Sequence, residues 1–238
     1  MRSSTNLVLV LDVAPLYCRP GPPHERTYVP SDRFARFLPL AGVLAGLLLA
    51  GGLILTYSIP SSETSFDQTF AWWQDNRGQH QISGLLLAPL VALMLIFFGA
   101  GLQRSLRSND HDSGHGSVAF GGAILGAAGF ALIGMLEGAA TNAAHEGHRE
   151  AVYALSQLHS YDWLTFNAAW AAVLLATGLG ARRNGMFPSA LAWGTIVLGA
   201  TQLTPIGFLG SLLIPPWLIV VGIWLFRSKA AVPTEPVG

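Results

Sequence analysis

The sequence has little charge, a single cysteine and a single lysine. Only 11% of its 238 residues are charged, whereas soluble domains carry about 25%, and 51% are hydrophobic. The shortage of charge argues against a soluble domain. With 27 glycines spread through Leu/Ala/Val runs, it favours a polytopic membrane protein. The lone cysteine, Cys18, excludes an internal disulfide and a zinc site built from cysteines.

Motifs of the common enzyme classes are also missing. The sequence has no HExxH motif, Gly-rich phosphate loop, nucleophile elbow or kinase signature. No catalytic residue is therefore predicted, and whether the protein is an enzyme stays open. Twelve arginines beside the one lysine, with abundant Ala and Gly, are typical of a GC-rich bacterial genome.

Apolar segments of about 20 residues recur along the chain, the length that a helix needs to cross the hydrocarbon core of a bilayer. The last block, 187–226, is long enough for two crossings, so we expect a tight hairpin around TQLTPIG (201–207). The predicted fold class is all-α, a polytopic transmembrane helical bundle of about six spans within residues 36–228. The predicted spans are 37–59, 82–102, 118–140, 163–181, 187–203 and 207–227.

Prolines and glycines predict local features of these spans. Pro89 should kink the second span, and Pro215 and Pro216 should bend the sixth, because proline cannot donate a helical hydrogen bond. Glycines spaced four apart let helix backbones approach closely in lipid. Such pairs occur at Gly42/Gly46, Gly122/Gly126 and Gly134/Gly138.

Basic residues fall almost entirely on one side of the predicted spans. Eleven lie in the two tails and in the loops after the second and fourth spans, and two, Arg77 and Arg149, lie in the opposite loops. The positive-inside rule then places both termini in the cytoplasm of a bacterium, with the protein in the plasma membrane. Residues 1–35 are predicted to be an irregular cytoplasmic tail, and 229–238 a second one.

The stretch EGAATNAAHEGHREAVYALSQLHSYDW (137–163) concentrates ionisable residues on the predicted outer side. If the third helix continues through Arg149, four of its residues fall within about 80° of one another on one face. These residues are Glu137, Thr141, His145 and His148. On the fourth helix His159 and Asp162 are three apart, and His80 lies where the second span begins.

Three interpretations of this cluster stay open. His145 and His148, with Glu137 or His159, would suit a divalent metal such as zinc. Alternatively, His80 and His159 could hold a haem between two spans. The third interpretation is a solvated rim whose polar residues end the helices and face water.

Glu137 lies closest to the membrane. Burying an ionised carboxylate in hydrocarbon costs about 2.5–3.5 kcal/mol or more, so a role as ligand or proton relay is one hypothesis. Its place near a helix end, where water can reach it, is the alternative explanation. Asn167 and Gln202 are predicted to form hydrogen bonds between helices.

One stretch also suggests a family. The segment WWQDNRGQHQISGLLLAPLVALMLIFFGAGLQRSLR (72–107), followed by a Gly/Ala-rich span and a paired-span block, resembles uncharacterised six-span integral-membrane proteins of actinobacteria. The resemblance covers most of residues 36–228. It implies a helical bundle in the plasma membrane, and it implies no activity and no functional residues.

Two classes of function are expected. The first is a non-catalytic membrane subunit or regulator. The second is a metal- or proton-handling protein that uses the outer His/Glu cluster. Transport is a weaker third option, because no inverted repeat is evident. The expected partners are the lipid bilayer and further copies of the chain or other membrane subunits, and no nucleic acid is expected.

Overall fold

The computed structural model describes residues 33–55, 60, 64–107, 114–161 and 163–230. All regular elements among these residues are helices, which confirms the predicted all-α transmembrane class. Five segments are long and apolar enough to cross a membrane: Phe34–Leu55, Arg77–Arg107, His115–Glu146, Arg149–Arg183 and Leu209–Ser228. Most of the two predicted tails, and Asp162, lie outside the described residues.

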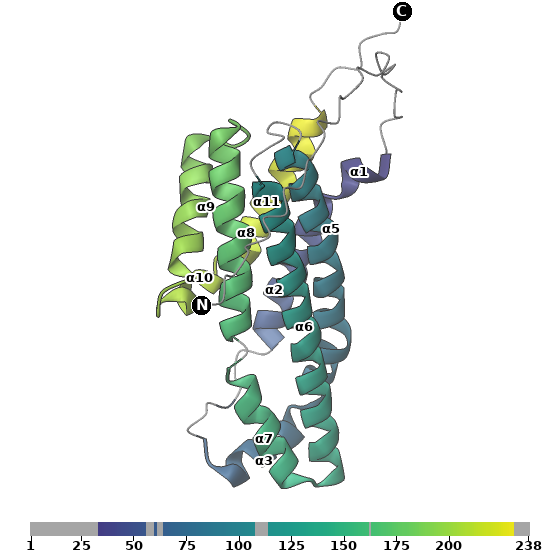
Figure 1. The fold of residues 1–238 in the computed structure, drawn as a ribbon. Coiled ribbons are helices and arrows are strands. Elements are labelled where there is room, and N and C mark those ends of the chain that lie inside the picture. Colours follow the sequence, from purple (N-terminus) through teal and green to yellow (C-terminus); the bar gives the residue numbers. More distant parts are fainter. Residues whose placement is uncertain (1–32, 56–59, 61–63, 108–113, 162, 231–238) are drawn as a thin grey trace, which may run out of the picture. The chain divides into compact units, whose positions relative to one another are not determined.

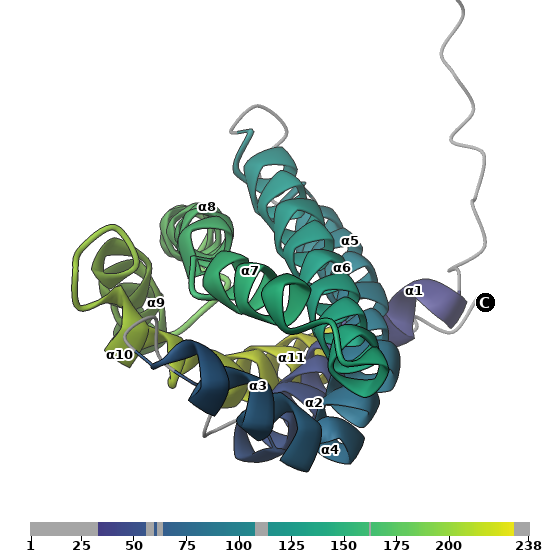
Figure 2. The ribbon, with the colours of Figure 1, turned by 90° about the horizontal axis from the view of Figure 1, so that it is seen from below.

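Six helices form the bundle, and each packs against the next in the order α9, α8, α6, α5, α2, α11 (Figures 1 and 2). The Trp217 indole of α11 donates a hydrogen bond of 3.0 Å to the Thr195 hydroxyl of α9. This bond links the last helix of the order to the first. Large apolar side chains, among them Leu95 and Phe98, fill the interior. The helices are α2 (Leu40–Leu55), α5 (Ala88–Arg107), α6 (His115–Glu146), α8 (Trp163–Arg183), α9 (Ser189–Thr201) and α11 (Ile214–Ala230).

Shorter helices flank the bundle. Helix α1 (Arg33–Phe37) precedes α2, and α10 (Gly207–Ser211) precedes α11. Helices α3 (Phe66–Asp75) and α7 (Arg149–His159) pack on each other beyond the end of α8, and we call them the outer layer (Figure 1). Residues 60–80, expected to form an outer loop between the first and second predicted spans, are therefore mostly helical where they are described.

The second span contains a π-helical turn instead of a simple kink. Between α4 (Arg77–Ile82) and α5 lies η1 (Ser83–Leu87), and the Ala88 amide donates to the Ser83 carbonyl five residues earlier. Pro89 has no amide hydrogen to donate, and its ring would crowd the carbonyl of Leu85. The distortion predicted at Pro89 therefore takes the form of a wider turn just before it.

The predicted bend at Pro215 and Pro216 also takes another form. The chain is interrupted at Leu212 and Leu213, and the two prolines occupy the second and third positions of α11. Amides in the first turn of a helix have no partner within the helix, so proline fits there. The prolines begin a new helix instead of bending a continuous one.

The prediction that the third helix continues through Arg149 was wrong. Helix α6 ends at Glu146 because Gly147 adopts a left-handed conformation with φ of 81°. The His148 amide then bonds back to the Ala143 carbonyl at 2.9 Å, as in a common glycine-terminated helix end. The fourth helix, predicted to extend backwards from Trp163, is likewise interrupted by a turn at Ser160 and Tyr161.

Glycines set the closest contact between η1 and α6. A Cβ atom at Gly134 would lie 2.5 Å from the Gly84 carbonyl oxygen, and one at Gly84 would lie 2.9 Å from the Glu137 Cβ. A Cβ atom at Gly122 would likewise lie 2.9 Å from Val173 of α8. These contacts confirm close packing at Gly122 and Gly134, and they bring the π-helical turn beside Glu137.

We expect Gly134→Ala to destabilise the protein by about 1–3 kcal/mol, because the added methyl group meets a backbone oxygen that cannot move aside. Gly121→Ala is the matched control on the same helix, since a Cβ there has no neighbour within 4 Å. The measurement is the free energy of unfolding in mixed detergent micelles. Equal stability of the two variants would contradict the close contact.

Candidate functional site

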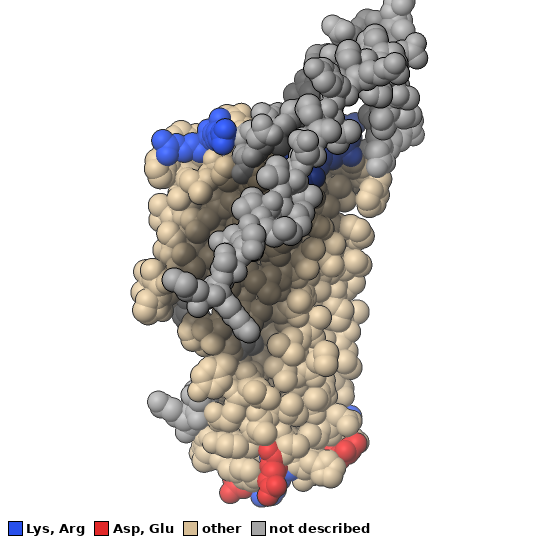
Figure 3. All heavy atoms as spheres, in the orientation of Figure 1, with Lys and Arg blue, Asp and Glu red and all other residues tan. Residues whose placement is uncertain are grey.

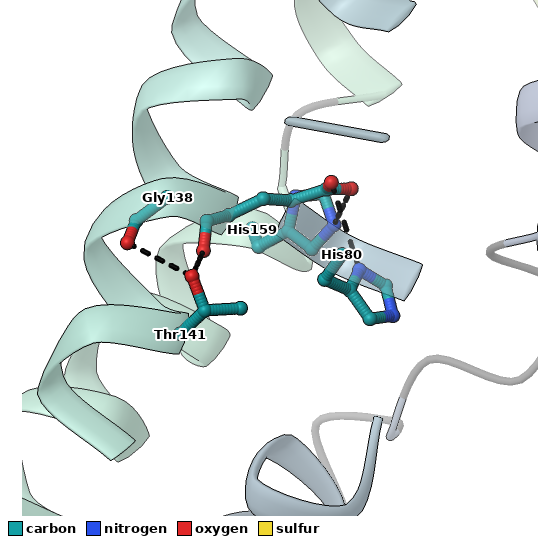
Figure 4. A network of polar contacts seen from close by, with 5 residues as sticks. His80, Gly138, Thr141 and His159 are labelled. Carbon is teal, nitrogen blue, oxygen red and sulfur yellow. Dashed lines mark hydrogen bonds and ion pairs between the residues drawn. The ribbon is translucent and has the colours of Figure 1, made fainter. Parts of the chain in front are cut away.

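Three ionisable side chains from three helices meet at the level where α7 joins α8. Glu137 of α6 is 2% exposed, His80 of α4 is fully buried, and His159 ends α7 at 7% exposure. His80 Nδ1 lies 3.6 Å from Glu137 Oε2, and His159 Nε2 lies 3.8 Å from Glu137 Oε1. Figure 4 shows the imidazoles of His80 and His159 turned toward the same carboxylate. We call these three residues the Glu137 cluster.

The two contacts are longer than hydrogen bonds, which rarely exceed about 3.2 Å. Glu137 Oε2 and both ring nitrogens of His80 have no hydrogen-bond partner among the described residues. A buried polar group without a partner costs about 1–3 kcal/mol. The cluster is therefore held at ion-pair distance and is not a completed hydrogen-bond network.

Two indole rings surround His80. The ring centroids of Trp72 and Trp73 lie 4.9 and 4.8 Å from that of the imidazole, and Trp73 is fully buried. Both indole rings belong to α3 and lie against the imidazole of His80. The outer layer thus contributes an aromatic wall to the cluster.

Thr141 does not compete for the carboxylate. Its hydroxyl donates to the backbone carbonyls of Glu137 and Gly138 at 2.9 and 3.0 Å (Figure 4). Thr141 lies one turn beyond Glu137 and is buried, while His145 lies one further turn along and is exposed. The predicted column of polar residues on α6 therefore runs from the cluster to the rim, without His148.

The four predicted metal ligands separate into two groups. Glu137 and His159 are together, while His145 and His148 lie at the exposed rim. His145 Nδ1 accepts a hydrogen bond of 2.9 Å from Arg77. His148 pairs instead with Glu146 at 3.2 Å, because Gly147 turns the chain away from the helix column.

The described residues contain no group of three or more His, Cys, Asp or Glu arranged to hold a metal ion. The haem pair predicted at His80 and His159 also meets an obstacle. Both imidazoles contact oxygens of the same carboxylate, so Glu137 occupies the position that a shared ligand would take. Zinc binding stays a prediction, and its four predicted ligands do not converge.

Sequence reasoning missed how Trp73 and Gly84 shape the site. From the sequence, Trp73 is expected only near a membrane boundary, where aromatic rings prefer to lie, yet in the structure it packs on His80. Gly84 lies four residues after His80 and contacts Gly134, three residues before Glu137. This pair of glycines was the signal that could have linked the two helices.

Gln202 forms the predicted hydrogen bond between helices. Its Oε1 accepts a hydrogen bond of 3.2 Å from the Ser211 hydroxyl of α10. Asn167, the other residue predicted for this role, is buried with its side-chain amide against Gly207.

Comparison of the chain with protein-family models, curated proteins and solved structures gives no match. The resemblance to six-span membrane proteins of actinobacteria stays a prediction.

A double-mutant cycle tests whether Glu137 and His80 act on each other. We expect Glu137→Gln and His80→Gln to show a coupling of about 0.5–3 kcal/mol in the free energy of unfolding, because the buried side chains share a contact. The cycle of Glu137→Gln with His145→Gln should show no coupling, since His145 bonds to Arg77 at the rim. Equal coupling in both cycles would refute the placement of these residues.

Elemental analysis of purified protein tests the rim histidines as ligands. We expect the double variant His145→Ala/His148→Ala to have the same zinc, iron and copper content as the wild type, because the two imidazoles have separate partners, Arg77 and Glu146. A stoichiometric metal that is present in the wild type and lost from the double variant would contradict this geometry.

Proposed function

We propose that this chain is a non-catalytic membrane protein that binds and releases protons at its outer end, as a pH-responsive subunit or regulator. One observation carries the proposal: the buried carboxylate of Glu137 lies between two buried imidazoles, at 3.6 and 3.8 Å. Imidazole is the side chain whose charge most readily changes near neutral pH. An intramembrane ionisable residue with named partners is by default a functional site.

The charge of the cluster depends on its protons. With Glu137 ionised and one imidazole protonated, the cluster is neutral. With both imidazoles neutral it carries one negative charge, and with both protonated it carries one positive charge. An uncompensated charge is costly away from water, so each change in the number of bound protons changes the electrostatic energy of the cluster. Gain or loss of a proton then changes the forces between α4, α6 and α7.

The interior of the bundle supports proton binding from one side only. Among the described residues, the buried ionisable side chains are His80, Glu137 and His159, all in one cluster. Apolar side chains such as Leu102 and Leu174 fill the core between the cluster and the far end of the helices. Proton relays across membranes are built from chains of ionisable groups, and the described core has no such chain.

Charge at the two ends supports the orientation. Figure 3 shows large groups of Lys and Arg atoms at one end, and Asp and Glu side chains with smaller groups of Lys or Arg atoms at the other. Five arginines lie in the last turns of α5 and α8 or near the end of α11: Arg104, Arg107, Arg182, Arg183 and Arg227. We therefore place the Glu137 cluster on the extracytoplasmic side of a bacterial plasma membrane, with both termini in the cytoplasm.

Infrared difference spectroscopy tests proton binding by the cluster. We expect acidification of the protein in lipid to change the bands of a buried carboxyl group and of histidine, because the added proton is shared within the cluster. Glu137→Gln should remove these changes. Glu146→Gln is the matched control, since Glu146 is half-exposed at the same end of α6 and pairs with His148. Identical spectra from the wild type and Glu137→Gln would overturn the proposal.

The same protein in vesicles containing a pH-sensitive dye tests the direction of access. Under a proton gradient and a membrane potential, we expect proton entry no faster than in vesicles without protein. Rapid entry that Glu137→Gln abolishes would contradict one-sided binding and would favour conduction across the membrane.

A further inference from the structure

The turn between α9 and α11 displays apolar side chains on its surface. Five aliphatic residues in it are more than half exposed: Leu203, Ile206, Leu209, Leu212 and Leu213. We call these five residues the turn patch. The polar amides of Asn167 and Gln202 lie on the opposite side, where a Cβ at Gly207 or Gly210 would come within 2.9 or 2.6 Å of them. The turn is thus polar toward the protein and apolar toward its surroundings.

The hairpin is too short for this turn to pass beyond the bilayer. Helix α9 has 13 residues, which gives about 20 Å at about 1.5 Å per residue, against about 30 Å of hydrocarbon. On the other leg, the segment Leu209–Ser228 reaches spanning length only when part of α10 is counted with α11. From Ile214 to Arg227, α11 alone rises about 20 Å. The Trp224 indole bonds to the Met186 carbonyl at 3.0 Å, which fixes the two legs at the same depth near their charged end.

Neighbouring helices continue past this level. Helix α6 has 32 residues and is about 48 Å long. Figure 1 shows α10 level with the start of α8, whereas α6 continues to the outer layer. The bundle is therefore stepped beside α10.

The hairpin also has no group that would anchor its turn in water. No Asp, Glu, Lys or Arg occurs in residues 184–226. By contrast, the outer layer carries charged residues such as Asp67 and Arg149, which pair at 3.0 Å.

Hydroxyl groups satisfy the backbone of the turn from within. Thr201 donates to the Leu198 carbonyl at 2.8 Å, Thr204 to that of Thr201 at 2.7 Å, and Ser211 to that of Gly207 at 3.1 Å. The amides of Leu203, Thr204, Gly207, Leu209, Gly210 and Leu213 also donate to carbonyls inside the turn. Backbone in contact with hydrocarbon must find all its partners internally, and this turn largely does so.

We infer that the α9–α11 hairpin ends inside the membrane, in the leaflet on the side of the outer layer, and that lipid acyl chains cover the turn patch. Both legs enter from the arginine-rich end. The surface beside α10 then faces lipid. The outer layer, which lies further from the arginine-rich end, is the part of the protein on this side that reaches water.

Spin labels on single cysteines test this inference in the full chain reconstituted in lipid, with Cys18→Ser as the background. Leu209→Cys reports on the turn patch. Val197→Cys, on an exposed face of α9, is the control for lipid, and Gln68→Cys, on an exposed face of α3, is the control for water. The measurement is the collision rate of each label with oxygen and with a water-soluble nickel chelate.

We expect the label at 209 to match that at 197, with frequent oxygen collisions and nickel collisions several-fold rarer than at 68. Nickel collisions as frequent as at 68 would place the turn in water and overturn the inference. Rare collisions with both reagents would show that protein, such as a second copy of the chain, covers the patch, and would overturn it equally. Unchanged gel filtration of each variant confirms that it is folded.

Discussion

The close approach of Gly84 and Gly134 is the constraint on which the candidate site depends. Only without side chains at these positions can η1 lie against α6 so tightly that a Cβ would come within 2.5 Å of a backbone oxygen. That contact places His80 beside Glu137, and the end of α7 adds His159. The π-helical turn that Pro89 favours belongs to the same segment. The close backbone approach of η1 and α6 brings His80 and Glu137 together.

The bundle separates two kinds of interior. At the level of the Glu137 cluster the helices enclose ionisable and aromatic groups beneath the outer layer. Toward the arginine-rich end the same helices enclose only apolar and uncharged polar side chains among the described residues. Under the proposed function, a proton bound at Glu137 would change how α4, α6 and α7 attract one another, while the apolar core would keep the rest of the bundle unchanged. This division suits a regulator that responds to conditions on one side of a membrane.

Composition and hydropathy were sufficient to predict the all-α membrane bundle, because a span needs only length and apolarity. Glu137 could be singled out for the same reason, since a carboxylate inside an apolar helix is conspicuous. The sequence placed His80 and His159 at the same end of the spans as Glu137, but it could not show that these two, and not His145 and His148, contact the carboxylate. The column of His145 and His148 assumed a helix that Gly147 ends, and the periodicity of one helix says nothing about His80 on another. Contacts between helices depend on glycine packing and on the π-helical turn, and a single sequence encodes both only weakly.

Solid-state NMR of the protein in lipid, with ¹⁵N-labelled histidine, tests whether His80 and His159 share a proton with Glu137. The shifts of the ring nitrogens report the protonation of each imidazole, and His80→Gln and His159→Gln assign the signals. If the two imidazoles share a proton with Glu137, their signals will change together as the pH is varied, and Glu137→Gln will alter both titrations while that of His145 stays the same. Independent titrations of His80 and His159 that Glu137→Gln leaves unchanged would contradict the account.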